Sequence, residues 1–275
     1  MTISLGLMMF PALMILIFIG FPVAFSLFGV AVLFGYIRFG DVLVHQLIAK
    51  VDDVASYYVL SAVPLFIFMG CMLEKSGVSE KHFEAVHLVT RKLPGGLAIA
   101  TVVLCVFFAA ASGVVGAAES VVGLMVISVM LRHGYDKGLI SGTICAGGSL
   151  GTIIPPSVVV VILSPIAGVG VGNLFVGIMF PGLILAGLYI VYILLRCSIW
   201  PEDGPSVDNG ESYGSIASQT WVVFSSLVPL FGLIFSVLGT IMLGWATPTE
   251  AGAMGAIGTI IPVSYTHLRA HETLT

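Results

Sequence analysis

The chain has 275 residues, of which 58% are hydrophobic and 9% are charged, and its mean hydropathy is +1.13. These values lie far outside the range of soluble globular domains, and the net charge of −4 is spread over short polar segments without the basic runs of a nucleic-acid-binding protein. Many apolar runs reach the roughly 20 residues that a membrane-spanning helix needs. The composition therefore predicts an all-α, polytopic protein of the lipid bilayer with no nucleic-acid partner.

The N-terminal part, residues 1–73, is predicted to hold transmembrane helices and one interfacial helix. The apolar run from Ile3 to Ile37 is too long for one straight crossing, and Pro22 near its centre predicts two helical pieces. Between Asp41 and Ser56, charged residues accompany apolar ones at helical spacing, which predicts a helix along the membrane interface. A further span is predicted from Tyr57 to Leu73.

Residues 74–94 form the most basic polar segment of the chain. The positive-inside rule places such a segment in the cytoplasm, here as an amphipathic loop or helix. Its basic residues are Lys75, Lys81, Arg91 and Lys92. The apolar run that follows, Leu97 to Leu131, is interrupted by Ala111-Ser112-Gly113. Two apolar arms around such a tip fit a re-entrant hairpin, which enters and leaves on one side, as well as they fit two separate spans.

The stretch from Gly147 to Ser157, GGSLGTIIPPS, lies in apolar sequence but carries helix-breaking residues. Pro155 and Pro156 remove two backbone donors, so a helix must stop before them and restart after them. Such a break leaves carbonyls that can coordinate Na⁺, and a second half-helix, capped near Ser157, that presents its positive end to an anion. The alternative is a proline kink with glycines that permit close helix packing. Two adjacent prolines with several glycines and hydroxyls favour the binding site.

The C-terminal part begins with a predicted span from Val171 to Leu195, closed by Arg196. A polar connector follows, and two apolar segments come after it, Trp221 to Leu243 and Thr247 onward. From Ser264 the sequence changes abruptly to SYTHLRAHETLT, which places charged residues inside what is predicted to be a continuing apolar helix. We expect this tail to be non-native, as in a read-through into vector or adapter sequence.

Glu119 and Glu250 are the only acidic residues inside apolar runs, where a carboxylate is costly. For Glu119 we expect a buried hydrogen-bonding role rather than proton transfer. The string Thr247-Pro248-Thr249-Glu250 fits a helix-capping box as well as a functional site. The histidines lie in polar segments and receive no special role. The four cysteines lack CxxC spacing, and no GxxxxGK[ST] loop is present, so we expect no cofactor, disulfide, metal centre or use of ATP.

Three strings together resemble the large membrane (permease) subunit of TRAP transporters, the tripartite ATP-independent periplasmic systems for organic acids. They are ASGVVGAAES (111–120), GGSLGTIIPPS (147–157) and WATPTEAGAMGA (245–256), with PLFIFMG (64–70) upstream. The resemblance covers residues 1 to about 262. It implies an inverted-repeat, elevator-type secondary transporter of the bacterial inner membrane that imports carboxylated solutes, such as dicarboxylates or sugar acids, with Na⁺ as the coupling ion. It also implies two partners, a small membrane subunit and a periplasmic solute-binding protein.

The resemblance also assigns a substrate and ion site to the tip and the broken helix. The site residues would be Ser112, Gly113, Gly147, Gly148, Ser149, Gly151, Thr152, Pro155, Pro156 and Ser157. The tip has fewer serines than is common in the family, and the second repeat, with its own hairpin and Pro-Pro break, is missing, so we expect half of the substrate site to be absent. Other inverted-repeat anion carriers or proton-coupled carriers are the alternative. An intramembrane enzyme is disfavoured because no His, Lys or Asp accompanies Ser112 or Glu119 at membrane depth.

The resulting division of the chain has six segments. They are the N-terminal helices (1–73), the cytoplasmic segment (74–94), the first-repeat transport region with hairpin and broken helix (95–196), the polar connector (197–219), the start of the second repeat (220–263) and the non-native tail (264–275).

Overall fold

The structure is a computed structural model that describes residues 2–75, 78–113, 117–206 and 216–272. Every regular element in these described ranges is helical, as the composition predicts. The chain divides into two compact units, Met1–Tyr58 and Val59–Thr275. The division into six segments predicted from the sequence does not follow this boundary, and it stays a prediction.

The first unit consists of three helices, α1 (Thr2–Ile19), α2 (Val23–Phe39) and α3 (Val42–Ala55). The break between α1 and α2 falls at Gly20, whose φ of 102° favours glycine, and at Pro22, which precedes the first residue of α2. The two predicted helical pieces and the predicted third helix are therefore confirmed. The position of α3 along the membrane interface stays a prediction.

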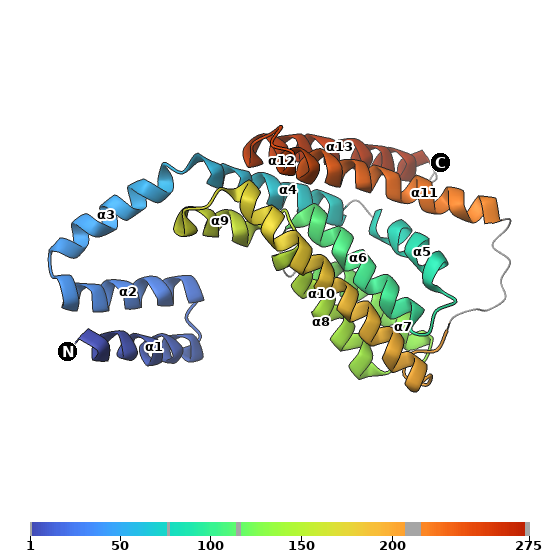
Figure 1. The fold of residues 1–275 in the computed structure, drawn as a ribbon, viewed down its shortest axis with the longest axis horizontal. Helices are drawn as coiled ribbons and strands as arrows, with labels where there is room; N and C mark the ends of the chain where they lie inside the picture. The colour runs from blue at the N-terminus through green and yellow to red at the C-terminus, as the bar shows by residue number, and fades with distance from the viewer. Residues whose placement is uncertain (1, 76–77, 114–116, 207–215, 273–275) are drawn as a thin grey trace. The chain divides into compact units, whose positions relative to one another are not determined.

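The second unit contains a bundle of helices that Figure 1 draws from cyan to red. In chain order, the elements from the unit boundary onward are η1 (Tyr58–Ser61), α4 (Ala62–Lys75), α5 (Val78–Thr90), α6 (Gly96–Ser112), α7 (Ala117–Arg132), α8 (Lys137–Ile153), α9 (Val158–Ala167), α10 (Val171–Ile199), α11 (Ile216–Ile234), the π-helical turn η2 (Phe235–Gly239), α12 (Thr240–Met242) and α13 (Pro248–Glu272). The span predicted from Tyr57 to Leu73 thus begins as a 3₁₀ turn, and its α-helix starts only at Ala62.

The core of the second unit centres on α6 and α8, which pack side by side. Leu97 and Leu104 of α6 and Leu150 of α8 are fully buried. The two helices approach closely because Gly147 faces Cys105, and a Cβ atom at position 147 would lie 2.7 Å from the sulfur. Helices α7 and α10 pack against the same pair. This arrangement places the end of α6 and the end of α8 next to each other.

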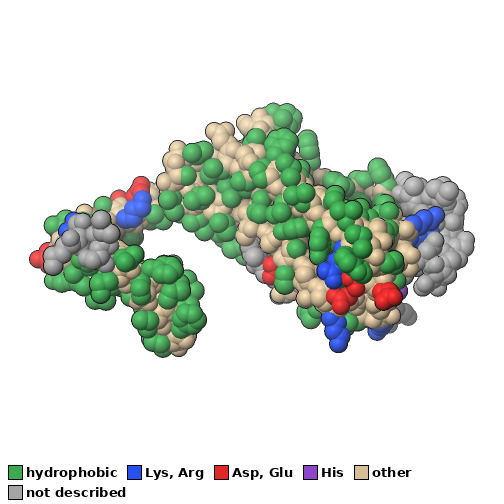
Figure 2. Space-filling model, turned by 60° about the horizontal axis from the view of Figure 1, so that its bottom comes forward, with side chains coloured by type: hydrophobic (Ala, Val, Ile, Leu, Met, Phe, Trp, Pro, Cys, Tyr) green, Lys and Arg blue, Asp and Glu red, His purple; other side chains and the backbone are tan. Residues whose placement is uncertain are grey.

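One helix of the described residues, α10, is long and apolar enough to cross a membrane alone, and up to three spans result if each of two bent helix pairs is counted as one. Its 29 residues correspond to about 43 Å. One of the bent pairs is α8 with α9. Figure 2 shows hydrophobic side chains over most of the visible face of the second unit, with charged ones gathered toward one end.

This charged end is held together by hydrogen bonds between three loops. The N–H groups of Gly95 and Asp136 donate to the carbonyls of Gly204 and Asp203, both at 3.0 Å. The Leu97 N–H donates to the Tyr135 hydroxyl oxygen at 3.2 Å, and burial raises the pKa of Tyr135 to about 12. These bonds join the start of α6, the α7–α8 loop and the segment after α10. The five basic residues on these elements, Arg91, Lys92, Arg132, Lys137 and Arg196, therefore lie at one end of the bundle.

Candidate functional site

The helix that begins at Lys137 breaks where the sequence predicts. Helix α8 ends at Ile153 and α9 begins at Val158, and their axes differ by 42°. Pro155 and Pro156 lack the N–H groups that would bond the carbonyls four residues earlier, on Gly151 and Thr152. Two consecutive acceptors at the end of α8 thus lose their helical donors.

One hydroxyl group, that of Ser157, replaces a donor that the prolines remove, and two others bond carbonyls earlier in α8. The Ser157 hydroxyl donates to the Thr152 carbonyl at 2.8 Å, the Thr152 hydroxyl donates to the Ser149 carbonyl at 2.7 Å, and the Ser149 hydroxyl donates to the Ala146 carbonyl at 2.7 Å. Ser157 is the N-cap residue of α9, as the sequence predicts, but its side chain makes no capping hydrogen bond. Its hydroxyl turns back because the Thr152 carbonyl is a partly buried acceptor without a backbone donor, and such an acceptor is costly to leave unpaired.

The tip of the α6–α7 hairpin contacts this break. Gly113 follows α6 with a φ of 61°, and its carbonyl accepts a hydrogen bond from the Val158 N–H at 3.2 Å. A Cβ atom at position 113 would overlap the carbonyl oxygen of Pro156, so only glycine fits. The Ser112 side chain and residues 114–116 lie outside the described residues. The structure thus brings Gly113 to Pro156, Ser157 and Val158, and the role of these residues in binding stays a prediction.

The tip and the break lie at the same distance from the charged end of the bundle. Helices α6 and α8 both start there and have 17 residues each, which corresponds to about 25 Å. Gly182, near the middle of α10, packs against the last turn of α8, since a Cβ atom there would lie 3.1 Å from both Ile153 and Ile154. The meeting point is therefore level with the middle of the longest apolar helix.

Three helix ends with different polarity meet at this point. The C-terminal ends of α6 and α8 each carry a partial negative charge, equivalent to about half an elementary charge, and the N-terminal end of α9 carries a similar positive one. Val158 uses its N–H on Gly113, whereas Val159 and Val160 stand at positions whose N–H groups have no helical acceptor. The arrangement offers carbonyl oxygens to a small cation and N–H groups to an anion.

The other predicted site residues lie elsewhere. Gly147 faces Cys105 of α6, and Gly148 lies under Glu119, whose Cγ, Cδ and Oε1 atoms occupy the space that a Cβ at position 148 would need. Glu119 is half-buried in the first turn of α7 and contacts α8 before the break. Its expected buried hydrogen-bonding role stays a prediction.

The string around Glu250 forms a capping box at the start of α13. The Glu250 Oε2 atom accepts from the N–H and the hydroxyl of Thr247, both at 2.8 Å, and the Thr247 hydroxyl oxygen accepts from the Glu250 N–H at 3.3 Å. Of the two interpretations left open by the sequence, local capping is the one that this geometry supports. The Thr249 hydroxyl oxygen is buried and has no hydrogen-bond partner among the described residues.

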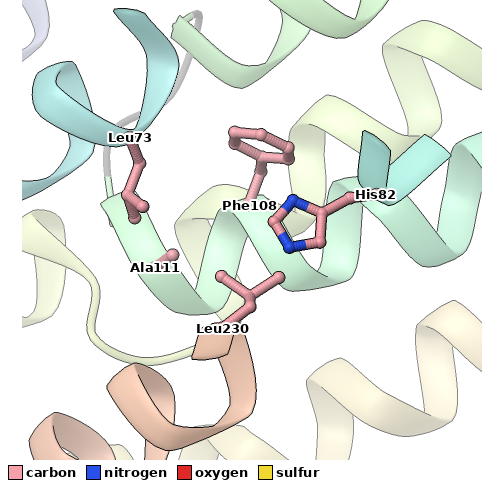
Figure 3. Close-up of a pocket in the computed structure, with 5 residues that line it drawn as sticks. All are labelled: Leu73, His82, Phe108, Ala111 and Leu230. Carbon is pink, nitrogen blue, oxygen red and sulfur yellow. The ribbon is translucent and has the colours of Figure 1, made fainter. Parts of the chain in front are cut away.

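One buried polar side chain was missed by the sequence analysis, which places all histidines in polar segments. His82 is only 3% exposed and points into a small pocket between α4, α5, α6 and α11 (Figure 3). The pocket is lined by Leu73, His82, Phe108, Ala111 and Leu230. Helical spacing could have revealed this burial, because Ala85 and Val86, three and four residues on, lie on the same buried face.

Residues 10–273 match the family described as "Tripartite ATP-independent periplasmic transporter, DctM component". The C4-dicarboxylate TRAP transporter large permease protein DctM of Vibrio cholerae is 34% identical over 242 residues, which cover 87% of this chain and 51% of the relative. Its Pseudomonas aeruginosa counterpart is 33% identical over 216 residues, covering 78% and 48%. The sialic acid TRAP transporter permease protein SiaT of Haemophilus influenzae is 25% identical over 253 residues, covering 90% and 39%.

The chain spans about half the length of the Vibrio cholerae and Pseudomonas aeruginosa relatives that it matches. The family match includes residues 264–273, within the tail expected to be non-native, so the origin of that tail stays a prediction. The family is one of integral membrane transporter subunits, in agreement with the apolar helices and with the three strings noted in the sequence. With nearly its whole length matched, the chain belongs to the family of the DctM component, the large permease of TRAP transporters.

Proposed function

We propose that this chain is the first-repeat part of a permease that imports carboxylated organic solutes by Na⁺-coupled secondary transport. The permease works in the bacterial inner membrane with a small membrane subunit and a periplasmic solute-binding protein, and its two inverted repeats operate as an elevator. Relatives are named for C4-dicarboxylates, isethionate, ectoine and sialic acid. Because these names differ, family membership supports transport but leaves the solute open.

The observation that carries the proposal is the contact between the hairpin tip and the broken helix. The Gly113 carbonyl meets the start of α9, and the Gly151 carbonyl has lost its helical donor to Pro155. Both lie where two negative helix ends converge, and unwound carbonyls with helix C-terminal ends are how membrane transporters coordinate Na⁺. Neutral carbonyl and hydroxyl oxygens, supported by partial charges only, suit a monovalent cation better than a divalent one.

The depth of this contact supports a re-entrant hairpin. Both arms of the hairpin begin and end at the charged end of the bundle, while the tip reaches only the level of Gly182 in α10. The five basic residues at that end support its placement in the cytoplasm. In this orientation the tip lies at mid-membrane, and α9 points its N-terminal N–H groups at the same level, where a solute carboxylate would be bound.

The proposal is tested by the effect of Na⁺ on the stability of the purified chain in detergent. A ligand that binds only the folded state raises the unfolding temperature, and the rise grows with its concentration. We expect a higher unfolding temperature in NaCl than in KCl or LiCl at equal ionic strength. Equal temperatures in the three salts would contradict a Na⁺ site in this half of the permease.

The transport part of the proposal is tested on a full-length permease that contains these residues. Uptake of a C4-dicarboxylate into proteoliposomes is expected to require an inward Na⁺ gradient, the small subunit and the binding protein. Uptake that follows a proton gradient or an anion exchange, without need of Na⁺ or a binding protein, would support the alternative class of carrier instead.

A further inference from the structure

Glu119 occupies a position that the sequence leaves without a specific partner. Its side chain lies directly on the Cα atom of Gly148, so that a methyl group at position 148 would overlap the glutamate Cγ, Cδ and Oε1 atoms. The next turn shows the reverse arrangement, in which a Cβ at Gly123 of α7 would lie 3.4 Å from Ile144 of α8. Large and small residues thus alternate across the seam between α7 and α8, and the Glu119–Gly148 contact is the tighter of the two.

This contact lies on the opposite side of the break from the Gly113–Val158 hydrogen bond. Gly148 belongs to α8, seven residues before Pro155 and therefore about 10 Å from it along the helix. Val158 belongs to α9, after the break, and its N–H donates to the tip at 3.2 Å. The hairpin thus contacts α8 through Glu119 and α9 through Gly113, and these two contacts lie on opposite sides of the break.

We propose that Glu119 is a positioning residue for the cation site: seated on Gly148, it fixes the hairpin to α8 while Gly113 fixes it to α9, so the hairpin sets the geometry of the carbonyls at the break. This inference rests on the proposed Na⁺ site and assigns it a further determinant. The contact works by shape, because the glutamate stem fills the space that the missing Cβ leaves open. Loss of the stem loosens the tip and weakens cation binding without removing any cation ligand.

The test combines three substitutions with a matched control in the purified chain, measured as unfolding temperature in KCl and as half-saturating Na⁺ concentration for the Na⁺-specific increase. Gly148→Ala is expected to lower the unfolding temperature and to abolish the increase. Glu119→Ala is expected to raise the half-saturating Na⁺ concentration by about tenfold, a coupling effect of ordinary size. Glu119→Gln, which keeps the shape, is expected to match the unsubstituted chain.

The decisive variant is Gly148→Ala combined with Glu119→Ala. Because the second substitution vacates the space that the new methyl group needs, the double variant is expected to recover most of the unfolding temperature and of the Na⁺-specific increase that Gly148→Ala loses. The control is Gly142→Ala, on an exposed part of the same helix where a Cβ atom meets nothing within 4 Å, and it is expected to change neither quantity.

The outcomes separate this inference from the proposed function. If neither the unsubstituted chain nor any variant gains stability in NaCl, the Na⁺ site is refuted. Recovery of the unfolding temperature in KCl by the double variant still reports whether Glu119 contacts Gly148. If the unsubstituted chain responds to Na⁺ but the double variant shows no recovery, the positioning role is overturned. A loss of the Na⁺ response in Glu119→Gln would also overturn it, since the charge would then matter rather than the shape. If Gly148→Ala does not fold, the comparison of Glu119→Ala with Glu119→Gln decides alone.

Discussion

The two ends of α8 are built in opposite ways. At its start, the Asp136 carboxylate accepts the Leu139 N–H at 2.9 Å, a local N-cap within four residues of sequence. At its end, two prolines remove the donors and the Ser157 hydroxyl donates to the Thr152 carbonyl, while the Val158 N–H at the start of α9 donates to a hairpin tip more than 40 residues earlier in the chain. A locally capped end is self-sufficient, whereas a break that depends partly on another element can exchange its partners for a ligand.

A single proline inside a helix need not produce such an end. Pro181 lies inside α10, which continues unbroken for 29 residues, and Pro11, Pro165 and Pro229 likewise lie within helices. One missing N–H leaves one carbonyl to satisfy, which a membrane helix tolerates. The adjacent pair at 155 and 156 leaves two consecutive carbonyls without donors, and α8 stops there. The adjacent pair, rather than the presence of proline, therefore separates this break from the helices that continue through one proline.

The largest effect is expected when the N–H donors missing at Pro155 and Pro156 are restored, which would make the two ends of α8 alike. In Pro155→Ala with Pro156→Ala, the new N–H groups can bond the carbonyls of Gly151 and Thr152, each bond contributing about 1 kcal/mol, so that α8 continues through the break. We expect the Na⁺-specific rise in unfolding temperature to disappear while membrane insertion is retained. Pro181→Ala is the matched control and should leave that rise unchanged. A double variant that still responds to Na⁺ would show that the break only shapes the fold.

How far the sequence predicts this site depends on the range of the interactions involved. The break at Pro155 is predicted, and the capping box at Glu250 is one of two interpretations left open, because both follow from residues within a few positions of each other. The direction of the Ser157 hydroxyl is not predicted, because the choice between capping forward and bonding backward depends on which partly buried acceptor lacks a donor. The contacts of Gly113 with Val158 and of Glu119 with Gly148 join segments about 30 to 45 residues apart, and no local pattern reports them.

The start of α8 and the turn after α9 should also differ in the side of the membrane that they approach. We expect Lys137→Cys, at the charged end, to resist an impermeant thiol reagent added to intact cells, and Val169→Cys, in the turn after α9, to react, because basic loops stay in the cytoplasm. Both variants require replacement of the exposed Cys71 and Cys145 by serine. Permeabilised cells provide the control, in which both positions should react. The opposite labelling pattern would indicate the reverse topology, with the three hydrogen-bonded loops of the charged end outside the cell.

The smallest expected effect concerns the first residues of two helices, α9 and α13. Both α9 and α13 follow a hydroxyl residue beside a proline, but Ser157 donates backward to Thr152, whereas Thr247 and Glu250 bond each other. If Glu250 only caps α13, Glu250→Gln should lower the unfolding temperature slightly and Thr247→Ala should cost about 1 kcal/mol, as lost N-caps do. Neither should change the half-saturating Na⁺ concentration. Ser157→Ala should raise that concentration, because the Thr152 carbonyl at the break then loses the hydroxyl that orients it. If Thr247→Ala and Ser157→Ala raised the half-saturating Na⁺ concentration equally, the start of α13 would belong to the ion site. The distinction between a local cap and a cap shared with the break would then be wrong.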